Sequence, residues 1–146
     1  MLTKSILLVE DNPQDEMLTL RALRKANLAN RIDVVRDGQQ ALDYLFKEGD
    51  YTNRDTPDLP TVILLDISLP RLSGLEVLER LRADSRTSLV PIVILTSSDE
   101  ERDRIKSYEM GVNSFVRKPV DFAKFAETVA LLGVYWLATN EPPIAK

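Results

Sequence analysis

Acidic, hydroxyl and basic side chains directly follow four of the apolar runs in this sequence. They are Glu10-Asp11, Asp66, Thr96-Ser97 and Lys118. In a sheet of parallel strands the carboxyl ends of the strands lie at one edge, and ligands bind in the crevice outside that edge. If the apolar runs are parallel strands, these side chains are therefore expected to line a single crevice.

Three of these side chains are carboxylates, and carboxylates brought together at neutral pH repel one another unless a cation neutralises them. Mg²⁺ is the predicted occupant, because it accepts carboxylate oxygens and keeps several waters. Each residue alone also has an ordinary structural interpretation, as a turn, a helix cap or the hydroxyl that ends a strand. Their occurrence at four strand ends in this order favours a functional site.

The chemistry follows from the residue types. A carboxylate can act as a nucleophile and form an aspartyl phosphate. Phosphoryl transfer depends mainly on positioning and on neutralising the phosphoryl oxygens. A metal ion, the ammonium of Lys118 and the hydroxyl of Thr96 are sufficient for that purpose. The residue types therefore predict phosphoryl transfer to a carboxylate of this crevice.

The elements that must position these residues alternate along the chain. Apolar runs predict strands at residues 5–9, 32–35, 61–65, 91–96 and 114–117. Helical patterns lie at 13–26, after Gly38, after Gly74, at about 98–110 and at about 121–138. This alternation predicts a doubly wound α/β fold, a five-stranded parallel sheet of flavodoxin-like order 2-1-3-4-5 with helices on both faces. The polar stretch 47–60 is expected to form an extended surface loop.

Composition limits the class of protein. The 146 residues predict one domain, 1–146, with a core at about 5–139 and a short polar tail at 140–146. With no cysteine and no histidine, thiolate sites and serine–histidine–aspartate catalysis are excluded. A net charge of −4 argues against a direct nucleic acid partner. The absence of a long apolar run or secretory signal predicts no membrane span and a cytoplasmic location.

Five segments resemble the receiver domains of two-component response regulators over about residues 5–135. They are LLVEDNPQD, DGQQALDYL, LLDISLPRLSGLEVL, PIVILTSS and VNSFVRKPVD. The separations from Asp66 to Thr96 and from Thr96 to Lys118 are also similar to those of the family. The long loop before the third strand and the Tyr135-Trp136-Leu137 segment resemble the single-domain regulators that serve cyanobacterial and bacterial phytochromes.

This resemblance implies a role for each residue of the crevice. Asp66 would receive a phosphoryl group from a sensor histidine kinase, with a phytochrome kinase as one candidate. Asp11, Asp66 and the backbone carbonyl of Ser68 would bind Mg²⁺, and Glu10 would act through a metal-bound water. Lys118 and the Thr96-Ser97 pair would contact the phosphoryl group, and the bond before Pro119 would be cis.

The resemblance also predicts a conformational switch and a kinase-binding face. In the family, the hydroxyl at Thr96 moves toward the phosphoryl group, and an aromatic residue at the place of Phe115 turns inward to fill the vacated space. An ordinary core or edge role for Phe115 is the alternative. Kinase contacts are expected on the first helix and on the loop after the fifth strand. The candidates on the helix, each of which could equally be an ordinary solvated residue, are Gln14, Asp15, Leu18 and Arg21.

The last predicted helix is apolar on more than one face. Its core-facing stripe is expected to be Phe122, Phe125, Val129, Leu132 and Trp136. A second apolar set lies off this stripe, at Leu131, Val134, Tyr135 and Ala138. Such a surface usually marks a partner interface, so a homodimer through this helix is expected. The alternative is that the C-terminal tail or the long loop covers it.

Three other functions have sequence features that can be tested. A phosphatase with an aspartyl nucleophile needs a general acid two residues later, where this chain has Ser68. A pseudo-receiver, a phosphorylation-independent interaction module, would lack part of the set Asp11, Asp66, Thr96 and Lys118. A transcription factor would need an effector domain, and the predicted elements leave no room for one. The leading interpretation is a receiver that catalyses only its own phosphorylation and dephosphorylation.

Overall fold

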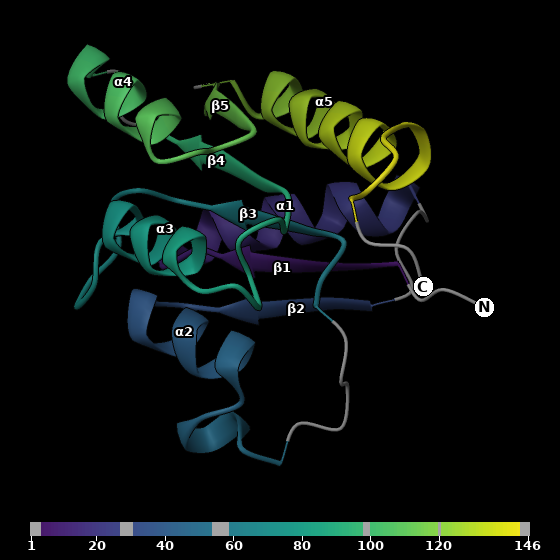
Figure 1. Cartoon of the computed structure of the whole chain (residues 1–146). Coiled ribbons are helices and arrows are strands. Elements are labelled where there is room, and N and C mark those ends of the chain that lie inside the picture. Colours follow the sequence, from purple (N-terminus) through teal and green to yellow (C-terminus); the bar gives the residue numbers. More distant parts are fainter. Residues whose placement is uncertain (1–3, 27–30, 54–58, 98–99, 120, 144–146) are drawn as a thin grey trace.

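One parallel sheet organises the computed structural model, which describes residues 4–26, 31–53, 59–97, 100–119 and 121–143 (Figure 1). Its five strands lie in the order β2-β1-β3-β4-β5 and every neighbouring pair is parallel. The predicted fold class and strand order are therefore confirmed. The strands are β1 (Ser5–Val9), β2 (Arg31–Val35), β3 (Val62–Leu65), β4 (Ile92–Thr96) and β5 (Ser114–Arg117).

The register of the sheet brings the ends of its central strands level. Leu65 of β3 pairs with Val9 of β1 and with Ile94 of β4. Strands β3 and β4 are buried along their whole length, and β1 is buried beyond its first residue. Because all three run in the same direction, the residues that follow them emerge side by side at one edge of the sheet.

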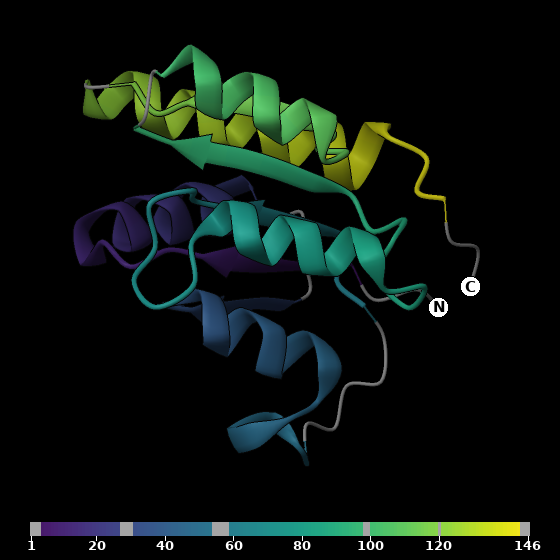
Figure 2. The same ribbon diagram turned by 60° about the vertical axis from the view of Figure 1, so that its left-hand side comes forward.

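Helices cover both faces of the sheet (Figures 1 and 2). Helices α1 (Pro13–Ala26) and α5 (Phe122–Gly133) share one face, where Leu23, Phe125 and Val129 pack against strand residues. The other face carries α2 (Gly38–Phe46), α3 (Gly74–Ala83) and α4 (Glu101–Glu109). Residues of α2 and α3, such as Leu42 and Leu78, form a second core with the opposite side of the strands. No helix in the described ranges is long and apolar enough to cross a bilayer.

Capping side chains fix the helix starts close to the strand ends. Asn12 Oδ1 accepts hydrogen bonds from the backbone N–H groups of Gln14 and Asp15, at 3.0 Å each. Asp37 caps α2, and Ser73 forms a capping box with Glu76 at the start of α3. These side chains satisfy amide groups that a helix start otherwise leaves unpaired. The turns next to the crevice are therefore well defined.

Three segments differ from the sequence-based expectation. Helix α4 begins at Glu101, where no side chain caps it, and Ser98, the expected start, lies outside the described residues. The stretch expected to be an extended loop contains a 3₁₀ helix, η1 (Gly49–Tyr51), in which Tyr51 packs edge-on against Tyr44. Residues 54–58 of that loop lie outside the description. After α5 the chain continues in a wider π-helix, η2 (Val134–Thr139).

Arg82 joins three connections at the opposite edge of the sheet from the crevice. Its guanidinium donates to the carbonyl oxygens of Gly111 at 2.9 Å, Val90 at 2.8 Å and Thr87 at 3.3 Å. A further bond goes to Asn113 Oδ1 at 3.0 Å. The end of α3, the approach to β4 and the loop after α4 are thereby held together by one side chain.

Candidate functional site

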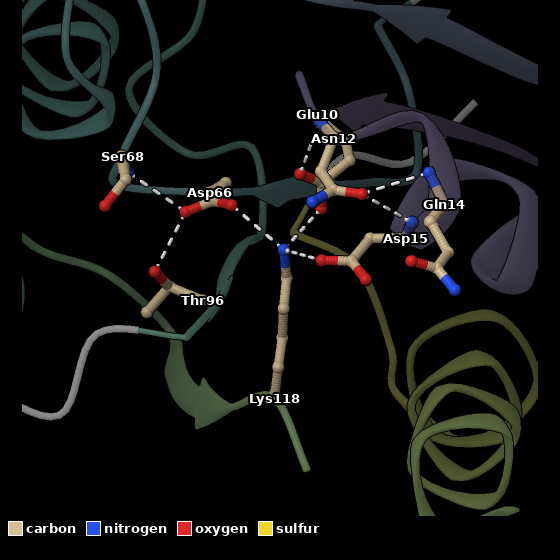
Figure 3. A network of polar contacts seen from close by, with 8 residues as sticks. All are labelled: Glu10, Asn12, Gln14, Asp15, Asp66, Ser68, Thr96 and Lys118. Carbon is tan, nitrogen blue, oxygen red and sulfur yellow. Dashed lines mark hydrogen bonds and ion pairs between the residues drawn. The ribbon is translucent and has the colours of Figure 1, made fainter. Parts of the chain in front are cut away.

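Asp66 is the central residue of a polar network at the carboxyl edge of the sheet (Figure 3). It follows β3 directly and is 5% exposed. Its Oδ1 accepts hydrogen bonds from Thr96 Oγ1 at 2.8 Å and from the backbone N–H of Ser68 at 3.0 Å. Its Oδ2 accepts from Lys118 Nζ at 2.9 Å. Both carboxylate oxygens are therefore held in fixed directions by donors from three separate segments.

Lys118 binds three carboxylates at once. Besides Asp66, its Nζ lies 2.6 Å from Glu10 Oε1 and 2.9 Å from Asp15 Oδ2. Burial alone would lower the pKa of Lys118. The hydrogen bond to Glu10, the charge of Asp66 and the hydrogen bond to Asp15 together outweigh burial and raise that pKa above its ordinary value. The side chain is therefore a permanent ammonium in the crevice.

Glu10 is almost fully buried at the end of β1, with 2% of its surface exposed. Its Oε2 accepts a hydrogen bond from the backbone N–H of Asn12 at 3.2 Å. Burial raises the pKa of the Glu10 carboxyl to about 7, and the bond to Lys118 only partly opposes this rise. A carboxyl with such a pKa is partly protonated at neutral pH.

Glu10, Asp11 and Asp66 could together bind a cation. Each offers a carboxylate oxygen, and the three oxygens lie within 4.8 Å of one another. Such oxygens are the donors that hard divalent cations such as Mg²⁺ prefer, so these residues fit the predicted metal. Asp11 is exposed, which leaves this side of the cluster open to solvent.

Gly74 sets the position of the Asp66 backbone, a role that the sequence reasoning missed. Its N–H donates to the carbonyl of Ile67 at 2.8 Å. A Cβ on Gly74 would lie 2.2 Å from the Asp66 carbonyl oxygen and 2.6 Å from the Ile67 Cα. These distances are impossible for non-bonded atoms, so glycine is required where α3 begins against the end of β3.

The remaining predicted site residues occupy varied environments. Thr96 is fully buried, whereas Ser97 is exposed at the end of β4. Phe115 is half-buried and packs against the core on the α2–α3 face. Of Ser68, the structure shows the backbone N–H at Asp66, and the role of its carbonyl as a metal ligand stays a prediction.

Among the four predicted kinase contacts, Gln14 and Arg21 are exposed. Leu18 is half-buried and packs against the core on the α1–α5 face. Asp15 instead takes part in the crevice through Lys118, which the sequence reasoning did not foresee. The signal that could have identified it is its place in the first turn of α1, directly after the strand end that carries Glu10 and Asp11.

The bond before Pro119 differs from the prediction. No cis peptide bond occurs among the described residues, which include Lys118 and Pro119, so this bond is trans and the expected cis bond is wrong for this structure. The two isomers of a bond before proline differ by only about 0.5–1 kcal/mol, so local sequence does not dictate the choice. With the trans bond, the Lys118 N–H donates to the Thr96 carbonyl at 2.7 Å, and its Nζ still reaches Asp66.

The raised pKa of Glu10 predicts that metal affinity depends on pH. A proton on Glu10 competes with a cation, so Mg²⁺ should bind more weakly at pH 6 than at pH 8, by up to about tenfold for a pKa near 7. Isothermal titration calorimetry with MgCl₂ at both pH values measures this difference. In Glu10→Gln the difference should largely disappear, and an equally steep pH dependence in that variant would assign the effect to another group.

Comparison with known proteins agrees with this geometry. Residues 6–130 match the family model described as response regulator receiver domain. The probable methanogenesis regulatory protein FilR2 of Methanothrix harundinacea is 40% identical over 94% of this chain and 86% of its own. The structure of bacteriophytochrome response regulator RtBRR is 52% identical, with a TM-score of 0.77, over 97% of this chain and 85% of that one. The Mn²⁺-bound structure of Rcp1, a response regulator of Synechocystis, is 34% identical, with a TM-score of 0.90, over 97% of this chain and 99% of that one.

The matched region contains the whole polar network, from Glu10 to Lys118. Ser68, two residues after Asp66, is not a general acid, so the site lacks what a phosphatase with an aspartyl nucleophile requires. The protein is a receiver rather than a conventional enzyme. The chain belongs to the family of response regulator receiver domains.

Proposed function

We propose that this receiver accepts a phosphoryl group from a sensor histidine kinase onto Asp66 in a Mg²⁺-dependent reaction, and that the modification changes its affinity for partners. The main support is the buried Asp66 carboxylate, held by Thr96 and Lys118 beside the acidic residues Glu10 and Asp11. Among the described residues, no other three acidic side chains bring their oxygens within 4.8 Å of one another.

In the proposed reaction, an oxygen of Asp66 attacks the phosphorus of a phosphohistidine. The new O–P bond forms as the N–P bond breaks, and the histidine nitrogen keeps the electron pair. Lys118 would neutralise phosphoryl oxygens, and Thr96 would donate its hydroxyl hydrogen to one of them. Dephosphorylation is a separate, slow hydrolysis. A water oxygen attacks phosphorus, the O–P bond to Asp66 breaks, and inorganic phosphate and the free Asp66 carboxylate are released.

The proposed Mg²⁺ ligands are Asp11, Asp66 and the carbonyl of Ser68, with Glu10 acting through a metal-bound water. Bound Mg²⁺ would neutralise charge on the transferred phosphoryl group. The presence of Mn²⁺ in the structure of the related Rcp1 supports a divalent cation at this site. The clustering of three carboxylates supports the same assignment from this chain alone.

A bacteriophytochrome kinase is the proposed phosphoryl donor, because RtBRR is described as a bacteriophytochrome response regulator and is 52% identical. The test is to incubate the protein with several radiolabelled, phosphorylated kinases, a bacteriophytochrome among them, and to follow transfer. Fastest transfer from the bacteriophytochrome is expected. Exchanging Gln14, Asp15, Leu18 and Arg21 for those of an unrelated receiver should change this preference. Equal transfer from every kinase would contradict the proposed donor.

Phosphorylation should be coupled to the conformation of Phe115 through Thr96. Thr96→Ala removes the hydroxyl that binds Asp66. A phosphoryl group on Asp66 would then lose the contact with β4 that distinguishes the phosphorylated state from the free state. We expect the phosphorylation-dependent change in partner affinity to fall by about tenfold, because a hydrogen bond to a charged group contributes roughly 1.5–3 kcal/mol. ¹⁹F NMR of fluorophenylalanine at position 115 reports the movement directly. An unchanged response in Thr96→Ala would rule out this coupling.

A homodimer through α5 and η2 is the proposed assembly. The core stripe is buried as expected at Phe125, Val129 and Trp136, and the side chain of Phe122 lies outside the described residues. The second set is exposed: Leu131 by 66%, Val134 by 45%, Tyr135 by 49%, and also Ala138.

The apolar surface continues onto the edge strand of the sheet. Leu131 and Tyr135 share a hollow with Ser114 and Val116 of β5, which has a neighbour on one side only. The described part of the tail runs elsewhere, since Asn140, Glu141 and Pro143 line a different hollow with Arg82. A second copy of the chain offers a matching apolar surface through two-fold symmetry.

Tyr135→Glu is expected to convert the dimer to a monomer. The new carboxylate would have to be buried without a partner at the interface, which should weaken association by at least about tenfold. Size-exclusion chromatography with light scattering at micromolar concentration measures the change. Met17→Glu, at an exposed position of α1, is the matched control and should remain dimeric. A wild-type protein that is monomeric with and without beryllofluoride would contradict the assembly.

A further inference from the structure

The Lys118 ammonium has three hydrogens and three carboxylate partners, one of which differs from the others. Glu10 and Asp66 belong to the group of three carboxylates that could bind a cation. Asp15 lies outside that group, in the first turn of α1, where its side chain is 26% exposed and its Oδ2 is 2.9 Å from Lys118 Nζ. Figure 3 shows Asp15 approaching the ammonium from the side opposite Asp66.

The three carboxylate partners of Lys118 would respond differently when a cation and a phosphoryl group bind, a state called the loaded site below. A bound cation and a phosphoryl group would both bind oxygens of Asp66, and the negative charge of Glu10 would also attract the cation. Asp15 has no such competing role, so it can keep its contact with Lys118. The contact would therefore matter less in the free protein, where Glu10 and Asp66 also hold the ammonium.

We propose that Asp15 is a positioning residue that anchors the Lys118 ammonium in the loaded site, so that its remaining hydrogens point toward the phosphoryl group on Asp66. This inference rests on the proposed function. Lysine has a long flexible side chain that loses much rotamer freedom when it is fixed. A carboxylate that stays in place fixes it before the phosphoryl group arrives. Because the contact stabilises the loaded state more than the free state, it shifts the equilibrium toward loading.

This role and simple electrostatics predict opposite changes in the affinity for a phosphoryl analogue when Asp15 is neutralised. If Asp15 were only a negative charge near an anion site, its neutralisation would strengthen binding of a phosphoryl analogue. If Asp15 anchors Lys118, Asp15→Asn should weaken that binding. We expect a loss of about two- to fivefold, the range for a partly exposed ion pair. Glu16→Gln is the matched control, because it is the next residue of α1, changes the charge equally and contacts Arg36 rather than Lys118.

The experiment is calorimetric titration of beryllofluoride into wild type, Asp15→Asn and Glu16→Gln at saturating MgCl₂. Weaker binding in Asp15→Asn, with unchanged or tighter binding in Glu16→Gln, supports the inference. Equal or tighter binding in Asp15→Asn overturns it, as does equal weakening in both variants. Wild-type protein that binds no beryllofluoride would contradict the proposed function as well, so the two failures are distinguishable.

A second measurement uses wild-type protein and does not depend on how a variant folds. NMR spectra that correlate the Lys118 Nζ with carboxylate carbons across hydrogen bonds should show Asp15 before loading. On saturation with Mg²⁺ and beryllofluoride, the Asp15 correlation should persist and the Asp66 correlation should disappear. Loss of the Asp15 correlation on loading would overturn the inference even if the calorimetric result agreed with it.

Discussion

Asp66→Asn is expected to abolish phosphorylation of the protein by acetyl phosphate and by a kinase. An amide is not a competent nucleophile, so no aspartyl phosphate can form at this position. The substitution also replaces one carboxylate oxygen by an NH₂ donor. This donor must then face either Lys118 or the two donors at Oδ1, Thr96 and the Ser68 N–H. Acid-labile, hydroxylamine-sensitive incorporation of labelled phosphate in the presence of Mg²⁺ measures the loss.

Two controls make this result specific. Asp84→Asn makes the same chemical change in a surface ion pair with Arg86, remote from the crevice, and should be labelled normally. Wild-type protein in a chelator should lose its labelling, because the carboxylate cluster needs a cation. Normal labelling of Asp66→Asn would show that another residue accepts the phosphoryl group. Undiminished labelling without divalent ions would contradict the proposed metal site.

Gly74→Ala is the second large effect expected. The added Cβ would lie 2.2 Å from the Asp66 carbonyl oxygen, so the start of α3 or the end of β3 must move. Overpacking of this kind costs about 1–3 kcal/mol of unfolding free energy. Because the movement includes Asp66 itself, the phosphorylation rate should also fall, by roughly tenfold or more.

Urea denaturation and the rate of labelling by acetyl phosphate measure the two consequences separately. Glu79→Ala, on the exposed side of the same helix, is the matched control and should change stability by less than about 0.5 kcal/mol. If Gly74→Ala unfolded at the same urea concentration as Glu79→Ala, the close approach would not be a constraint on the fold.

Much of the fold could be predicted because each strand and helix carries a local signal. The apolar runs of β1, β3 and β4 indicate burial on both faces, and the parallel arrangement follows from their alternation with helices. Parallel strands end at the same edge, so the convergence of Asp66, Thr96 and Lys118 could also be predicted.

Other features depend on tertiary geometry that no local pattern encodes. Whether Asp15 reaches Lys118 is decided by the rotation of α1 about its axis and by two side-chain conformations. The role of Gly74 depends on how closely α3 approaches the end of β3. The isomer of the bond before Pro119 was inferred from family resemblance alone, and here it is trans.

Arg82 holds the loop after α4 at the end of the helix that lies away from the crevice. Of the nine residues of α4, all of them described, Ser107 alone is buried, and the loop that follows is fixed through Gly111 and Asn113. The C-terminal end of α4, which lies away from Thr96, is therefore held in place. Its first turn, which no side chain caps, lies nearer to the crevice.

A helix held at one end is expected to rotate about that end rather than to slide along the sheet. Nine helical residues span about 13 Å, so a rotation of roughly 10° about Gly111 would displace the first turn by about 2 Å and the last turn hardly at all. A rearrangement at Thr96 would thereby become a graded displacement along the exposed side of α4, which carries Ile105 and Tyr108. If Asp66 is phosphorylated as proposed, the largest displacement of α4 is therefore expected at its Glu101 end.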